Sequence, residues 1–196
     1  MTSLEAALRK IGTELTQAGV PFALVGGLAV SVRTEPRFTR DADLVVALAG
    51  DAEAEALIHN LRAHGYGIEA VIEQEAVGRL ATVRLTPSRE PHAPVVDLLF
   101  ASSGIEAEVV ADAEPIELLP ELRMAVARTG HLIALKVLSR DDVKRPQDIA
   151  DLRALLRAAS PPELERARKS LALIATRGYH RGRDLALEID RLLRGQ

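Results

Sequence analysis

The sequence predicts an α/β (α+β) protein with a mixed β-sheet core flanked by helices and followed by a helical C-terminal third. In the first 120 residues, short apolar segments alternate with helical patterns, whereas from residue 129 onward the apolar spacing is helical throughout. Hydrophobic residues make up 47% of the 196 residues and charged residues 27%, which is typical of a packed globular chain. We expect two regions, a core over 1–127 and a helical region over 128–196.

The first half of the chain begins with a helix that Ser3 can cap and that Gly19 ends. Leu8, Ile11 and Leu15 share one face of this helix. The remaining expected elements of this half are a strand over 21–25, a helix over 28–33, a polar loop over 34–40, a strand over 41–48, a helix over 51–64 and strands over 68–73, 80–86 and 95–101.

Between these strands and the C-terminal helices the signals are weaker. Residues 87–94 are expected to form a loop, 102–104 a turn with a helix cap, and 108–119 another strand or two. Four helices follow, at about 129–139, 146–159, 162–177 and 182–194. Ser160 before Pro161 marks the start of the third of these, as a cap followed by proline at the first helical position.

Composition excludes several classes of function. Cysteine is absent, so there are no disulfides, thiolate zinc sites or cysteine nucleophiles, and this fits a reducing cytoplasm. Aromatic residues are only 3%, which argues against base stacking as the main mode of recognition. No uncharged apolar run reaches eighteen residues, and the first twenty residues carry several charges. We expect a cytoplasmic protein without a signal peptide or a membrane partner.

Charge is distributed unevenly along the chain. Residues 1–120 hold nine Lys/Arg and eighteen Asp/Glu, and residues 121–196 hold sixteen and ten, so net charges of −9 and +6 give the overall −3. An acidic half joined to a basic half suggests a metal on one side and a polyanion on the other. The alternative is that helix surfaces simply vary in charge.

A glycine pair and an acidic pair form the most informative motif. Gly26 and Gly27 lie between a predicted buried strand and a helix, where backbone N–H groups can approach a phosphate. Thirteen residues later, Asp41 and Asp43 point to the same side of the next predicted strand. Two carboxylates this close repel each other unless a cation lies between them, and hard oxygen ligands suit Mg²⁺. The motif therefore predicts a site for a phosphate and a metal ion.

A third acid, Asp97, interrupts the apolar run from Val95 to Phe100. Placing a carboxylate in a buried strand is costly unless it is paired or bound to a metal. This acid is therefore expected to join the site. The alternative is a strand whose Asp97 side faces water.

Together these features resemble the DNA polymerase β-type nucleotidyltransferase superfamily. The C-terminal part narrows the resemblance, because residues 132–136 (LIALK) and 145–152 (RPQDIADL) are similar to the lysine helix and the RxKDxxD segment of AbiEii-type toxins, including the mycobacterial MenT group. The similarity covers about residues 20–157. Gln147 stands where that family often has lysine, and residues 158–196 match no segment of it.

The resemblance implies a nucleotidyltransferase core over 1–127 completed by the region 128–196, with Mg²⁺ as cofactor. Lys136 would neutralise the triphosphate as a compact charge, and Asp148 could instead be an acid favoured by the helix dipole. The implied catalytic residues are Asp41, Asp43, Asp97, Lys136 and Asp151. The implied nucleotide-binding residues are Gly26, Gly27, Thr39, Arg40, Lys136 and Asp148. The implied metal ligands are Asp41, Asp43 and Asp97.

Thr39 lies two residues before the acidic pair, where the toxin group has a serine or threonine in its pocket. A phosphate on this hydroxyl would repel a nucleotide or capture its metal, which would make Thr39 a control point. The alternative is a hydroxyl that only hydrogen-bonds its loop. Arg33, Arg37 and Arg40 precede the acids and are candidates for phosphate contact, although solvated loop arginines are the alternative. The five histidines show no metal-ligand spacing.

The resemblance implies a toxin of a toxin–antitoxin system that moves NMP from an NTP, with a pyrimidine nucleotide as the candidate, to the 3′ end of tRNA and so blocks translation. A cognate antitoxin would be its partner. The alternatives are transfer to a small molecule or a protein hydroxyl, or an inactive nucleotidyltransferase fold that acts as an antitoxin or binding module. Intact acids and Lys136 argue against the inactive fold.

Overall fold

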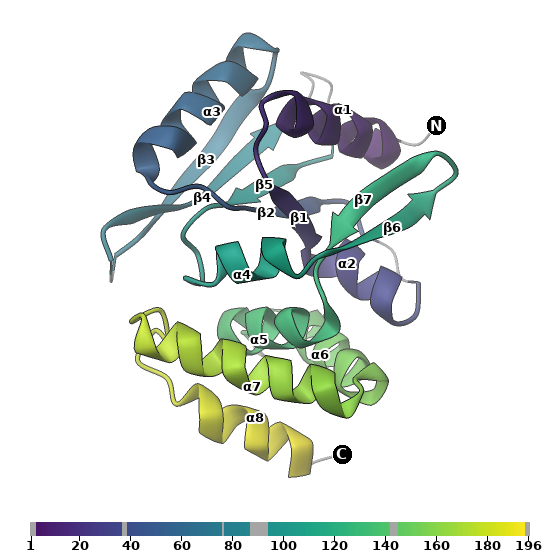
Figure 1. Ribbon diagram of the computed structural model, residues 1–196, viewed down its shortest axis with the longest axis vertical. Helices are drawn as coiled ribbons and strands as arrows, with labels where there is room; N and C mark the ends of the chain where they lie inside the picture. Colours follow the sequence, from purple (N-terminus) through teal and green to yellow (C-terminus); the bar gives the residue numbers. More distant parts are fainter. Residues whose placement is uncertain (1–2, 37–38, 76, 87–93, 142–144, 195–196) are drawn as a thin grey trace.

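A mixed sheet forms the centre of the protein in the computed structural model, which describes residues 3–36, 39–75, 77–86, 94–141 and 145–194 (Figure 1). Across these residues the strand order is β3-β4-β5-β2-β1-β7-β6. The β1–β7 and β2–β5 pairs are parallel and the other pairs are antiparallel. The strands are β1 (Phe22–Val25), β2 (Ala42–Val46), β3 (Gly67–Gln74), β4 (Arg79–Thr86), β5 (Val96–Leu99), β6 (Glu114–Leu119) and β7 (Leu122–Val126).

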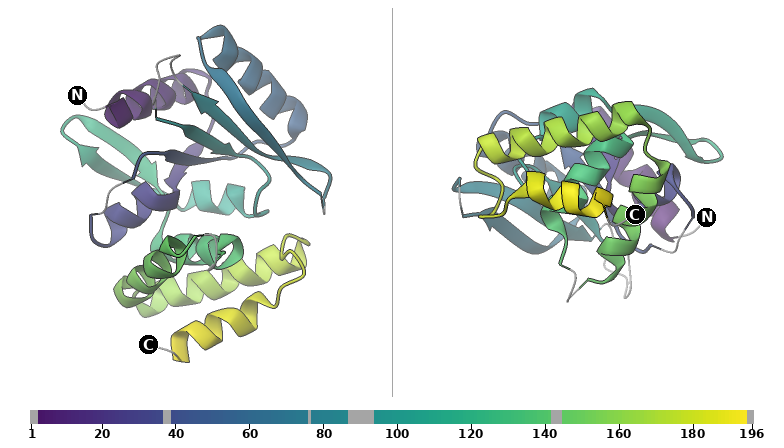
Figure 2. Two further views of the ribbon diagram at one scale, coloured as in Figure 1. Left: turned by 180° about the vertical axis from the view of Figure 1, so that it is seen from behind. Right: turned by 90° about the horizontal axis from the view of Figure 1, so that it is seen from below.

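Helices cover both faces of the sheet. The helices are α1 (Ser3–Gln17), α2 (Gly26–Arg33), α3 (Asp51–Ala63), α4 (Glu106–Ala111), α5 (Thr129–Ser139), α6 (Gln147–Ala158), α7 (Pro161–Thr176) and α8 (Leu185–Arg194). Figures 1 and 2 show α1 and α3 on one side, with α2, α4 and the C-terminal helices on the other. None of the helices in the described ranges has the length and apolar character needed to cross a membrane.

The sheet register brings the acidic residues together. In the central strands β1, β2 and β5, apolar side chains are buried and fix which residues face each other. Val25 pairs with Asp43 across β1 and β2, and Asp43 pairs with Asp97 across β2 and β5. Asp97 in turn lies opposite Arg84 on β4. Residues 54 positions apart in sequence therefore become direct neighbours on adjacent strands.

The predicted α/β (α+β) class is confirmed, and most elements agree within a few residues. The expectation of strands across 108–119 is wrong in its first part, where α4 forms. The Ser103 backbone N–H and hydroxyl both donate to the carboxylate of Glu106, the first residue of the helix, at 2.7 and 2.8 Å, and these bonds hold the turn that precedes it. The strand β7 was not predicted, and α2 begins at Gly26 rather than Leu28. Most of the predicted loop over 87–94 lies outside the described residues.

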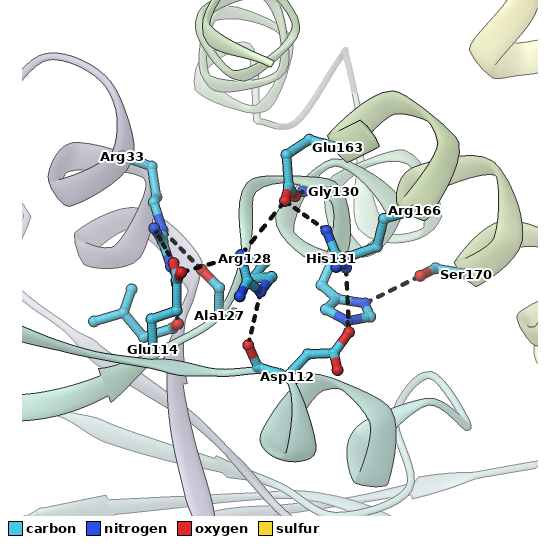
Figure 3. Close-up of polar contacts among 11 residues, drawn as sticks. Arg33, Asp112, Glu114, Ala127, Arg128, Gly130, His131, Glu163, Arg166 and Ser170 are labelled. Atoms are coloured by element: carbon cyan, nitrogen blue, oxygen red, sulfur yellow. Dashed lines mark hydrogen bonds and ion pairs between the residues drawn. The ribbon is translucent and has the colours of Figure 1, made fainter. Parts of the chain in front are cut away.

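Polar contacts attach the C-terminal helices to the sheet region, as Figure 3 shows. Asp112, after α4, accepts hydrogen bonds from Arg166 Nε at 3.1 Å and contacts His131 Nε2 at 3.2 Å. The other ring nitrogen of His131 lies 3.0 Å from the Ser170 hydroxyl. At the start of α5, the Gly130 N–H donates to the Glu163 carboxylate at 2.6 Å. These contacts fix the helix that carries Lys136.

Candidate functional site

The glycine pair brings the start of α2 directly against an acid. Gly26 has φ +63°, and a Cβ added to it would lie 1.9 Å from Oδ2 of Asp43, so only glycine fits there. The Gly27 backbone N–H donates to the Asp43 carboxylate. The turn therefore serves two purposes, because it admits the acid and leaves the N-terminal end of α2 open toward the neighbouring cavity.

Asp43 is the most strongly perturbed acid of the site. Its pKa is raised from 3.8 to about 6, chiefly by burial and then by the negative charges of Asp97 and Asp41. The positive charge of Lys136 and the Gly27 hydrogen bond oppose this increase. The charges of the other two predicted acids, Asp97 and Asp41, thus act on Asp43 and disfavour its ionised form.

Asp97 has a partner that the sequence did not reveal. Its two carboxylate oxygens accept hydrogen bonds from Arg84 Nε at 2.9 Å and Nη2 at 2.7 Å, and its residue exposure is only 8%. Such bidentate pairs are strong and directional. Asp97 is therefore a buried acid as expected, but with Arg84 as its neutralising neighbour, and its role as a metal ligand or base stays a prediction.

Lys136 lies between two buried acids of α6. Its Nζ is 2.8 Å from Asp148 Oδ1 and 2.9 Å from Asp151 Oδ2. Arg145 contacts the other oxygen of Asp148 at 3.2 Å, and Gln147 donates to Asp151 at 3.4 Å. The structure therefore brings together the lysine helix and both acids that the resemblance selected. Gln147, the residue that departs from the family pattern, contributes to holding Asp151.

A cavity of about 330 Å³ joins these groups. Its walls include Gly26, Gly27, Asp43, Lys136 and Asp148. Other predicted site residues are not among those that line it, namely Asp41, Asp97, Asp151, the half-buried Thr39 and the exposed Arg40.

Two lining residues, Arg181 and Ser102, were not singled out as site residues by sequence reasoning. Arg181 lies in the α7–α8 loop with φ 55° and donates to the carbonyl of Ser102 at 3.3 Å. Its pKa is lowered by burial of the guanidinium and by the charges of Arg183 and Arg145. The only sequence signal was the pair of glycines, 178 and 182, that brackets this loop.

Arg33, one of the arginines considered for phosphate contact, has other partners. Arg33 donates to the carbonyls of Ala127 and Val126 and pairs with Glu114 at 2.8 Å, so its guanidinium is committed to the junction in Figure 3. Phosphate contact by Arg33 is therefore not supported, because its donors already have acceptors. Arg37 lies outside the described residues.

The carboxylate oxygens of the site are ligands that suit a hard divalent cation, but their arrangement in the structure suits one less well. Asp43 of β2 and Asp41, just before that strand, provide oxygen ligands whose mutual repulsion a cation would relieve. Within the described part of the chain, however, no three histidine, aspartate or glutamate side chains are grouped so that they could hold a metal ion. Both carboxylate oxygens of the third acid, Asp97, accept hydrogen bonds from Arg84.

Comparison with known structures defines the class of protein. The antibiotic-resistance factor ANT(2'')-Ia is similar over 90% of this chain and 94% of its own, with a TM-score of 0.57 and 17% identity. A nucleotidyltransferase-like protein from Paracoccidioides brasiliensis is similar over 89% and 88%, with a TM-score of 0.54 and 18% identity. At such identities the likeness shows the nucleotidyltransferase fold. No curated protein matches the sequence.

The family follows from the sequence profile of the AbiEii nucleotidyl transferase toxins of type IV toxin–antitoxin systems, which matches residues 12–195. The chain belongs to this family and is a nucleotidyltransferase. The match extends through the C-terminal helices, beyond the segment in which the sequence motifs were recognised.

Proposed function

We propose that this protein transfers a nucleoside monophosphate from an NTP to the 3′ end of tRNA in a Mg²⁺-dependent reaction and thereby blocks translation. The observation that carries the proposal is the cavity in which a glycine turn, Asp43 and Lys136 converge. A triphosphate needs backbone donors and positive charge, whereas its metal needs carboxylates, and this cavity offers both.

The nucleotide would lie with its phosphates against the Gly26–Gly27 turn, where the first N–H groups of α2 lack helical acceptors. Asp41 and Asp43 would hold the Mg²⁺. A bound divalent cation would supply charge neutralisation of the phosphates and of the attacking and leaving oxygens. The raised pKa of Asp43 supports this assignment, because a bound cation would offset both the burial of this carboxylate and the negative charges of Asp97 and Asp41 beside it.

Lys136 would act on the phosphate side of the cavity, where its ion pairs with Asp148 and Asp151 fix the position of its ammonium group. The two pairs keep the lysine extended between α5 and α6 instead of leaving it mobile. Asp97 would orient or deprotonate the acceptor hydroxyl if the incoming substrate draws Arg84 away.

tRNA is proposed as the acceptor because the family resemblance points to it and because residues 121–196 carry a net charge of +6. A pyrimidine NTP is the candidate donor, and a cognate antitoxin is the proposed partner, as expected for a member of a toxin–antitoxin family. The second candidate acceptor is a small molecule. The similar structure of ANT(2'')-Ia in complex with adenylyl-2''-tobramycin supports it at the level of fold.

The experiment incubates the protein with each of four α-labelled NTPs and with total RNA, in Mg²⁺ or in EDTA. We expect label in the tRNA band with Mg²⁺ alone, strongest for one NTP, and none with Asp43→Asn. Label in no RNA species, together with adenylylated aminoglycoside from a parallel reaction, would favour the small-molecule acceptor. Absence of transfer to any acceptor by a folded protein that binds antitoxin would favour the inactive fold.

A further inference from the structure

A second hollow, here called the arginine groove, lies on the C-terminal helices and has a volume of about 850 Å³. Its lining comes from the end of α5, from α6, from the α7–α8 loop and from α8, and the view from below in Figure 2 looks onto these helices. The lining residues are Arg140, Arg153, Leu156, Arg157, Arg183, Glu188, Arg191 and Leu192.

The lining of the groove is rich in positive charge. It contains five arginines and one carboxylate, Glu188, which is already paired with Arg183. Among the residues that the structure describes, no carboxylate forms an ion pair with Arg153, Arg157 or Arg191. Arginines elsewhere, such as Arg33, Arg84 and Arg166, are each paired with an acid.

The groove is next to the nucleotide cavity. Arg183 Nη1 donates at 2.8 Å to the carbonyl of Leu138, a residue that lines the cavity. Arg140 directly follows Ser139, another lining residue of the cavity. Arg181 lies in the cavity wall two residues before Arg183, and the charges of Arg183 and Arg145 reach its guanidinium. Positive charge therefore continues from the candidate site into the groove.

We propose that the arginine groove binds the phosphodiester backbone of the RNA acceptor, in the nucleotides that precede its reactive 3′ end. The proposal rests on the proposed function, which makes RNA the acceptor and places its 3′ hydroxyl in the cavity. An acceptor whose 3′ hydroxyl enters the cavity must leave through a neighbouring surface, and this groove adjoins the cavity.

The lining chemistry favours phosphates over bases. Guanidinium groups bind phosphate oxygens through paired N–H donors, and Arg153 and Arg157 are one turn of α6 apart, about 6 Å, which suits successive phosphates of one strand. Among the described residues that line the groove none is aromatic, so they offer no surface on which bases could stack. Leu156 and Leu192 offer an apolar floor for ribose. Binding in the groove is therefore expected to be independent of sequence and sensitive to salt.

An acidic polypeptide, such as a segment of an antitoxin, is the competing occupant. The carboxylates of a peptide would also pair with the guanidinium groups. Nothing, however, would require the peptide to extend into the nucleotide cavity. The groove's continuity with that cavity is the reason why RNA is the favoured ligand.

The test measures binding of labelled tRNA and of a labelled single-stranded RNA by fluorescence anisotropy, without NTP, between 50 and 200 mM salt. The variant Arg153→Glu/Arg157→Glu is expected to weaken RNA binding at least tenfold. The neutral pair Arg153→Gln/Arg157→Gln should reduce the salt slope by about 1.4, because each lost contact with a single strand removes about 0.7. The matched control, Arg62→Glu/Arg123→Glu, makes the same charge change at exposed positions on α3 and β7 and should bind like the wild type.

Equal weakening by the control pair, or unchanged binding by both groove variants with normal circular dichroism, would overturn the proposal. So would polyglutamate binding that matches RNA at the same salt and is lost in the groove variants, since this would assign the groove to an acidic polypeptide. If RNA binds in the groove but receives no nucleotide in the presence of Mg²⁺ and NTP, the proposed function fails while the groove assignment stands.

Discussion

Asp43→Asn is expected to stabilise the metal-free protein while it abolishes nucleotidyl transfer. The folded-state pKa of Asp43 is about 6, compared with an ordinary value of 3.8. Because the folded pKa is raised, the associated stability is present at low pH and is lost as the pH rises through about 6. At about 1.4 kcal/mol per unit, a difference of about two units amounts to about 3 kcal/mol at pH 7.5.

Asparagine is nearly the same size as aspartate and keeps an oxygen that can accept the Gly27 N–H, but it carries no charge toward Asp97 and Asp41. The assay is urea denaturation in EDTA, followed by circular dichroism because the chain lacks tryptophan. The free energy of unfolding of Asp43→Asn should exceed that of the wild type by up to about 3 kcal/mol at pH 7.5 and by much less at pH 4. The control, Asp190→Asn, removes an exposed pair with Arg168 and should change stability by less than about 1 kcal/mol.

Adding Mg²⁺ gives the complementary measurement. A cation bound by Asp41 and Asp43 should raise the midpoint of wild-type unfolding and leave that of Asp43→Asn almost unchanged, because ligand binding to the folded state alone stabilises it. The reasoning is refuted if Asp43→Asn is no more stable than the wild type at pH 7.5, or if its gain is equal at both pH values.

Replacing Gly26 with alanine should lower stability by about 2 kcal/mol or more, as seen in urea denaturation, because alanine at positive φ is strained and its Cβ would overlap Asp43. Lys136→Met should abolish transfer and destabilise the fold by about 3–5 kcal/mol, because Asp148 and Asp151 would lose the ammonium group that lies between them, and a triple variant that also neutralises both acids should recover much of this loss. Burial lowers the pKa of His131, so the unfolded chain takes up its proton first and stability falls as the pH drops below about 6.5; His131→Gln should reduce the difference between pH 7.5 and 5.5. Thr39→Glu should be inactive in transfer and growth assays and Thr39→Ala at least partly active, and a fully active Thr39→Glu would contradict control at that hydroxyl.

The glycine turn and the acidic strand could be predicted because their signals are local. Gly26-Gly27 interrupts an apolar strand, and alternation puts Asp41 and Asp43 on one side of the next strand. The proximity of the acids of β2 and β5 was harder to predict from the sequence, because it depends on strand register rather than on sequence spacing. The pairing of Asp97 with Arg84 is of this kind, since it requires β4 to lie beside β5 in antiparallel register.

The incorrect predictions of secondary structure also have physical causes. Val109 and Val110 favour a strand by propensity, but they lie in α4, whose first residue, Glu106, accepts hydrogen bonds from Ser103 in the preceding turn. The strand β7 escaped notice because it is only five residues long and follows a turn of two residues, in which Glu121 has φ 62°. Arg181 lines the cavity because of the conformation of the α7–α8 loop, and no periodic pattern in the sequence predicts that conformation.

The distribution of charge around the cavity suggests why nucleotide and metal should bind together. Lys136 is paired with two buried acids, which offset part of the positive charge that it offers to a triphosphate. Asp43 faces the same cavity and would repel the phosphates while it is ionised and metal-free. Arg181 and Arg145 also line the cavity, but Arg145 is paired with Asp148, and the positive charge that remains is small against the roughly four negative charges of a triphosphate. Most of the neutralisation must therefore come from the divalent cation that the aspartates hold, and NTP affinity measured in EDTA should fall toward that of the nucleoside.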